Sequence, residues 1–168
     1  MKEQLILTTA LAALLTLTAA CTLSANPAKW EKFSFNGQDF QAGGPENSPA
    51  IWVRAGYLPR VAEPDEASRN LGKLPPNTGA VAGLCYRQTS GGKLVDQSST
   101  IPLPNEQITI SSPQEGVSVT SSNAAGVFIK ELFPGNYQLF CRGTGIEVRV
   151  TVGTTILVPI RGAKRMAD

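Results

Sequence analysis

In the second half of the chain, apolar and polar residues alternate in short runs that Gly, Pro, Asn and Ser separate. Ile146-Glu147-Val148-Arg149-Val150 shows the pattern most clearly, and a period of two residues is typical of a β-strand with one buried face. The runs predict strands at about 79–87, 106–111, 117–121, 126–132, 136–142, 145–152 and 155–160. Short strands at this spacing predict an all-β fold, a seven-stranded antiparallel sandwich.

The same alternation assigns a face to each side chain. We expect the apolar face of each strand to turn inward, while Thr109, Ser118, Glu147, Arg149 and Thr151 face water. The inward positions are Ile108 and Ile110; Val117 and Val119; Ile146, Val148, Val150 and Val152; and Ile156, Val158 and Ile160. The first predicted strand turns Val81, Gly83 and Cys85 to one side, and the fifth turns Tyr137, Leu139 and Cys141 to one side. Both cysteines are therefore expected to face the core.

Residues 21–78 are expected to form an extended arm, because Pro and Gly interrupt it repeatedly. Short strands are predicted at 32–35, at 38–40 after the Asn36-Gly37 turn signal, and at 51–54. Residues 62–73 allow one or two helical turns, with Asp65 as the cap and Gly72 as the stop. The sandwich is expected to span 79–161, and residues 162–168 form a short basic tail.

The arm carries more aromatic side chains than a solvated linker needs. Two interpretations stay open: the rings dock on a protein partner, or they cover the edge of the chain's own sandwich. The candidate partner-binding residues are Trp30, Phe33, Phe35, Trp52 and Tyr57.

The N-terminus carries an apolar run, Leu5 to Cys21, behind Lys2. Such a run is short for a membrane span and suits a secretory signal peptide of residues 1–20. Leu17-Thr18-Ala19-Ala20-Cys21 resembles the lipobox of bacterial lipoproteins, which implies cleavage before Cys21 and attachment of acyl chains such as palmitate to it. The protein would then be lipid-anchored to the cell envelope, in the outer membrane if the host has one. Alternatives are ordinary cleavage after Ala20 or Ala25, giving a periplasmic or secreted protein, and a retained anchor.

Three cysteines are an odd number for an exported protein. If Cys21 carries lipid, Cys85 and Cys141 remain to form one disulfide in an oxidising compartment. The alternative is that both are small core residues with free thiols.

Composition excludes several function classes. The chain has 15 basic and 13 acidic residues and no histidine. Near-neutral charge gives no electrostatic footprint for nucleic acid. Without histidine the commonest general base and zinc ligand are missing, so we expect no enzyme, cofactor or metal site. Catalysis would need a carboxylate pair such as Glu106 and Glu115 to converge in a cleft.

Four segments carry a family resemblance: Gly79-Ala80-Val81-Ala82-Gly83, Ile101-Pro102-Leu103-Pro104-Asn105, Asn123-Ala124-Ala125-Gly126-Val127-Phe128 and Leu132-Phe133-Pro134-Gly135-Asn136-Tyr137. In order, they resemble the carboxypeptidase regulatory-like domain, which implies a transthyretin-like (prealbumin-like) sandwich over about 79–161. A turn at Gly126 suits a positive φ angle, and Gly83 suits a close approach by another group. The segment from Gly126 to Leu132 is one residue shorter than this family leads us to expect. We therefore predict that Val127 and Ile129 point inward, with Phe128 exposed or in a bulge.

These observations favour a non-catalytic envelope module that mediates protein–protein interaction. The alternative is a carbohydrate or cell-wall binding module, in which exposed aromatic rings stack on sugars. Its candidate residues are Trp30, Trp52, Tyr57 and Tyr86.

Overall fold

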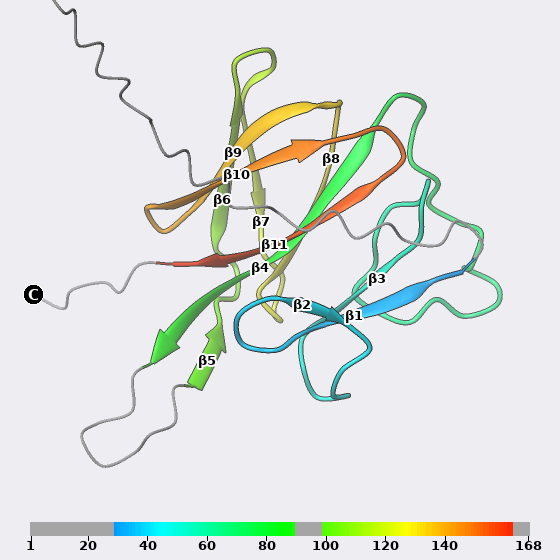
Figure 1. The fold of residues 1–168 in the computed structure, drawn as a ribbon, viewed down its shortest axis with the longest axis horizontal. Helices are drawn as coiled ribbons and strands as arrows, with labels where there is room; N and C mark the ends of the chain where they lie inside the picture. Colours follow the sequence, from blue (N-terminus) through cyan, green and yellow to red (C-terminus); the bar gives the residue numbers. More distant parts are fainter. Residues whose placement is uncertain (1–28, 90–98, 163–168) are drawn as a thin grey trace, which may run out of the picture.

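The computed structural model describes residues 29–89 and 99–162, and within these ranges the chain is all-β with no helix. Figure 1 shows the strands, which are β1 (Glu31–Phe35), β2 (Phe40–Ala42), β3 (Ala50–Val53), β4 (Gly79–Thr89), β5 (Ser99–Pro102), β6 (Gln107–Ser112), β7 (Gly116–Ser121), β8 (Val127–Leu132), β9 (Gly135–Cys141), β10 (Thr144–Val150) and β11 (Thr155–Arg161).

Two sheets form a sandwich from β4 to β11. One sheet has the order β10-β9-β6-β7, and the other places β4 between β11 on one side and β5 and β8 on the other. The seven predicted strands are present, with β5 as an eighth that the sequence did not predict. All pairs are antiparallel except β4 and β11, which run parallel from Thr155↔Ala80 to Arg161↔Tyr86.

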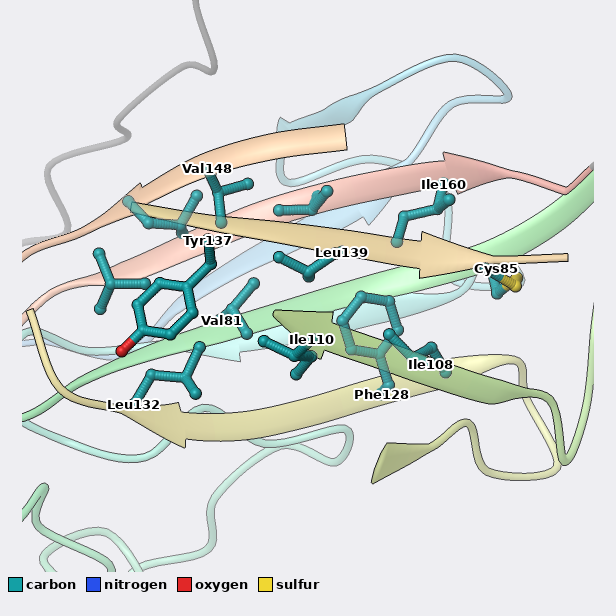
Figure 2. Packing of buried hydrophobic residues seen from close by; sticks show 14 of the residues in the cluster. Val81, Cys85, Ile108, Ile110, Phe128, Leu132, Tyr137, Leu139, Val148 and Ile160 are labelled. Carbon is teal, nitrogen blue, oxygen red and sulfur yellow. A yellow bond between two sulfur atoms is a disulfide. The ribbon is translucent and has the colours of Figure 1, made fainter. Parts of the chain in front are cut away.

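The core between these two sheets is built from the predicted faces. Val81, Tyr137 and Leu139 are almost fully buried there. Figure 2 shows these side chains lying together with Ile108 and Ile110 of β6. Ile156, Val158 and Ile160 of β11 complete it. The two-residue alternation therefore predicted the inward side of β4, β6, β9 and β11 correctly.

A disulfide joins the two sheets across this core. It links Cys85 of β4 to Cys141 of β9, whose Cα atoms lie 6.5 Å apart, within the range for such a bond. Neither cysteine is exposed. The prediction of a Cys85–Cys141 bond is confirmed, whereas Cys21 and the signal segment lie outside the described residues.

The arm folds into a third layer that covers the outer face of the β4 sheet. β1 lies between β2 and β3, and Phe33, Phe35 and Ile51 turn inward to meet Leu84 and Leu157. β4 is therefore buried on both faces, which explains why its sequence GAVAGLCY is almost continuously apolar rather than alternating. Figure 1 shows β1, β2 and β3 lying together beside β4.

The positions of Phe128 and of residues 62–73 differ from the expectations of the sequence. Phe128 is neither exposed nor in a bulge: its ring lies in the sandwich core with 1% exposure, while Val127 and Ile129 face the arm layer. Residues 62–73 form turns and no helix. Asp65 still caps one of these turns, because its Oδ1 accepts the Ser68 N–H at 2.8 Å.

Candidate functional site

β7 forms an open edge of the sandwich. Among the described residues it pairs only with β6, from Gln107↔Ser121 to Ser112↔Gly116. Its sequence, GVSVTS, contains no charged residue and no proline. Native edge strands usually carry such features because they discourage pairing with another chain.

The other sheet edges in the described part of the chain are shorter than β7 or carry a charged residue or a proline. β3 has four residues, and β11 contains Pro159 and Arg161. β8 carries Lys130 and Glu131, β5 has four residues and ends in Pro102, and β2 has three residues. β10 carries Glu147 and Arg149. An uncharged edge of six residues therefore distinguishes β7 from these strands.

Val117 and Val119 point away from the core, which corrects the sequence prediction. β7 pairs Ser118 with Ile110 and Thr120 with Ile108, so the polar residues share the core side of the sheet. The two valines face solvent and are 70% and 46% exposed. At an edge strand, solvent reaches both faces, so an alternating sequence does not by itself say which face is inward.

The two valines belong to a mixed apolar and uncharged surface on the outer face of the sheet. Register places Val119 beside Thr109, and Thr109 beside Phe140, which is 38% exposed. The Phe140 ring lies over Gly145 of β10, which has no side chain. A Cβ atom added to Gly145 would lie only 2.8 Å from the Phe140 Cδ1. We call Val117, Val119 and Phe140, with Thr109 and Ser111 between them, the β7 surface.

Buried groups hold the β6–β7 hairpin at both ends. At the Ser122 end, the buried Ser122 hydroxyl donates to the Leu103 carbonyl at 2.7 Å and accepts the Glu106 N–H at 2.9 Å. At the other end, Gly116 takes a positive φ of 76° in the turn, and the Ser112 hydroxyl donates to Gln114. The edge is thus presented by a fixed hairpin.

Tyr137 lies under the turn end of this hairpin. Its hydroxyl donates to the Phe133 carbonyl at 3.0 Å, closing the Leu-Phe-Pro-Gly-Asn-Tyr segment. Burial, followed by the hydrogen bond and charge of Glu115, raises the pKa of Tyr137 to about 12. The phenol therefore stays neutral at physiological pH.

Most arm aromatics proposed for partner binding turn into the chain's own interior. Phe33 and Phe35 are 2% and 4% exposed in the layer between arm and sandwich. Trp30 stacks edge-on against Tyr57, with ring centroids 5.8 Å apart, and its indole N–H donates to the Arg69 carbonyl. Trp52 is the partly exposed member of the five. Phe33 and Phe35 therefore cover a face of the sandwich rather than its edge.

The remaining sequence candidates do not come together. Tyr86 is buried against Phe35, with ring centroids 4.8 Å apart, so its face is not available to a sugar. Glu106 precedes β6 and forms an ion pair with Arg142, whereas Glu115 follows β6 at its opposite end. The structure therefore gives no cleft shared by the two carboxylates.

Within residues 29–89 and 99–162, no cluster of three or more Cys, Asp or Glu side chains could hold a metal ion. In the same ranges, no helix has the length and apolar character to cross a membrane.

Comparisons of this chain with protein-family models, with curated proteins and with solved structures find no match.

Proposed function

We propose that this protein is a non-catalytic module of the cell envelope that binds an envelope protein through β7. In this proposal the partner contributes an extended segment that pairs with the open edge, as in β-strand addition. The observation that carries the proposal is an unprotected edge strand whose exposed side chains, Val117 and Val119, are apolar. Charge depletion is typical of the centre of protein interfaces, and Thr109, Ser111 and Phe140 extend the uncharged surface inward from the edge.

The proposal includes export, with cleavage before Cys21 and acylation of that cysteine. The support is the lipobox-like Leu17 to Cys21 and the bond between Cys85 and Cys141, which leaves Cys21 as the unpaired cysteine. Disulfides persist mainly in oxidising compartments. Mass spectrometry of the mature protein tests this part: the expected species begins at an acylated Cys21. A mature form that begins at Asn26 without acyl mass contradicts it.

We also propose that residues 79–161 are a carboxypeptidase regulatory-like domain. The support is Tyr137, which closes the Leu132 to Tyr137 segment through its bond to the Phe133 carbonyl. A second supporting observation is Gly126, whose φ of 76° suits the turn after Asn123. The absence of histidine from the whole chain supports a binding role rather than catalysis.

The partner-binding proposal is tested by site-specific photo-crosslinking in the native envelope. A photoreactive residue at Val117 is expected to yield one crosslinked envelope protein, and Val119→Lys in the same chain is expected to abolish that product. Val152 is the matched control, since it is 54% exposed and lies in the turn after β10. Equal crosslinking from positions 117 and 152, or a product unaffected by Val119→Lys, contradicts the proposal.

A further inference from the structure

Three hollows follow one another across the arm layer. The first, of about 570 Å³, and the second, of about 440 Å³, share Lys32, Trp52 and Glu63 in their walls. The second and a third of about 510 Å³ share Ser48 and Pro49. Because neighbouring hollows share walls, they form a series that suits an extended ligand rather than a compact one.

Trp52 stands between the first two hollows. In β3 it alternates with the buried Ile51 and Val53, so its ring lies on the side of the arm sheet away from the sandwich. Lys32 is its register partner on β1. The Trp52 indole N–H makes no hydrogen bond within residues 29–89 and 99–162, so it is available to a ligand.

The charged groups beside Trp52 are of both signs. Lys32 and Glu63 line both hollows, and neither forms an ion pair with a described residue. Glu46 also lines the second hollow, and Arg69 also lines the first. A strongly charged ligand of either sign would meet repulsion from some of these groups, whereas a neutral ligand with many hydroxyls can accept from the cations and donate to the carboxylates.

The third hollow is lined by uncharged hydrogen-bonding groups. Its walls include Gln38, Asn47 and Gln88, whose side-chain amides make no hydrogen bond to any described residue. Ser48 and Thr100 add hydroxyls. Amides offer both donors and acceptors, which matches the hydroxyl and acetamido groups of sugars.

We propose that these hollows form a binding groove for a neutral glycan chain, with one sugar ring stacked on Trp52. This activity is separate from the protein interaction at β7, which lies on a different sheet. The aromatic ring supplies the apolar face that the C–H groups of a pyranose need, and the flanking hollows receive the neighbouring sugars through hydrogen bonds.

The test is calorimetric titration of the mature protein with three hexasaccharides, built from N-acetylglucosamine, from α-1,4-glucose and from β-1,4-glucose. At least one hexasaccharide is expected to bind. It should bind more tightly than the disaccharide of the same sugar, because the groove spans three hollows. Trp52→Leu is expected to weaken binding by tenfold or more. Phe133→Leu, which truncates an aromatic side chain that is 57% exposed outside the groove, is the matched control and is expected to bind as the wild type does.

A second pair of variants keeps the test independent of the folding of Trp52→Leu. Asn47→Ala and Gln88→Ala change only the third hollow, so they are expected to weaken the hexasaccharide and leave the disaccharide unaffected. The proposal is overturned if no hexasaccharide binds at 10 mM, a concentration chosen to detect binding free energies of about 3 kcal/mol. It is also overturned if Trp52→Leu and the third-hollow variants bind like the wild type, or if unglycosylated peptides bind the groove and glycans do not.

Discussion

The Phe128 ring lies directly over Gly83, its register partner on the neighbouring strand. A Cβ on Gly83 would stand 2.6 Å from the Phe128 Cζ and would also meet the Val158 carbonyl oxygen. One glycine thus lets β8 place an aromatic ring in the core and lets β11 pair closely with β4 on the other side.

Gly83→Ala is expected to lower the free energy of unfolding by about 1–3 kcal/mol, the usual cost of overpacking a dense core. Gly135→Ala is the matched control, because a Cβ there meets Tyr137 at an ordinary 3.5 Å. Urea unfolding of both variants measures the difference. Equal midpoints for the two variants would contradict the close approach at Gly83.

The Cys85–Cys141 bond closes a loop with a sequence separation of 56. Replacing both cysteines with alanine is expected to cost about 4 kcal/mol in the chain-entropy model. The measurement is urea unfolding of a chain that begins at Thr22, compared with the same chain lacking both cysteines. A count of two free thiols in the denatured, non-reduced protein would show that the bond does not form.

Stability is expected to fall at alkaline pH through Tyr137. Its folded pKa of about 12 lies above the ordinary value of 10, so the folded state holds the phenolic proton more tightly than the unfolded chain. The contribution of this proton to the free energy of unfolding is complete below pH 10 and is lost as the pH rises from 10 to 12. Burial also raises the pKa of Tyr86, so the wild type must be compared with Tyr137→Phe, whose stability should decline less over this range.

Tyr137→Phe itself is expected to cost about 1 kcal/mol at pH 7, because the Phe133 carbonyl loses its hydrogen bond from the hydroxyl. Urea unfolding at pH 7 and at pH 11 gives both values. If the wild type and Tyr137→Phe lose the same free energy of unfolding between pH 7 and pH 11, the alkaline effect belongs to other groups.

The arm and the sandwich are expected to unfold together, since Phe33 and Ile51 share one buried cluster with Leu84 and Leu157. Phe33→Ala should lower the free energy of unfolding of the whole protein by about 3–5 kcal/mol. Calorimetry should show one transition at a lower temperature. Leu71→Ala, at a side chain that is 61% exposed, is the control and should leave the transition unchanged. Two separate transitions in Phe33→Ala would mean that the layers are independent.

The sequence predicted most of the sandwich because strands such as β9 and β10 alternate between a buried and an exposed face. It did not predict β5, whose Ser99-Thr100-Ile101-Pro102 is short, polar and ended by proline. It placed Phe128 wrongly because the length of the 126–132 segment was taken to fix its face. In fact both faces of β8 are buried: Phe128 enters the sandwich core, and Val127 enters the arm layer.

The candidate surfaces were harder to foresee than the core. Val117 and Val119 alternate with Ser118 and Thr120 as a half-buried strand would, and only the register with Ile108 and Ile110 shows which side faces water. The useful signal was the lack of charge over 116–121, which marks an unprotected edge. In the arm, aromatic content alone could not separate Phe33, which is buried, from Trp52, which is partly exposed.

The parallel pairing of β4 with β11 also governs when the protein can finish folding. β11 ends at Arg161, so the chain must be available through this residue before the β4 sheet gains its last strand. Until then β4 keeps one side unpaired, and an unpaired strand edge of this kind makes a partly folded chain prone to aggregation.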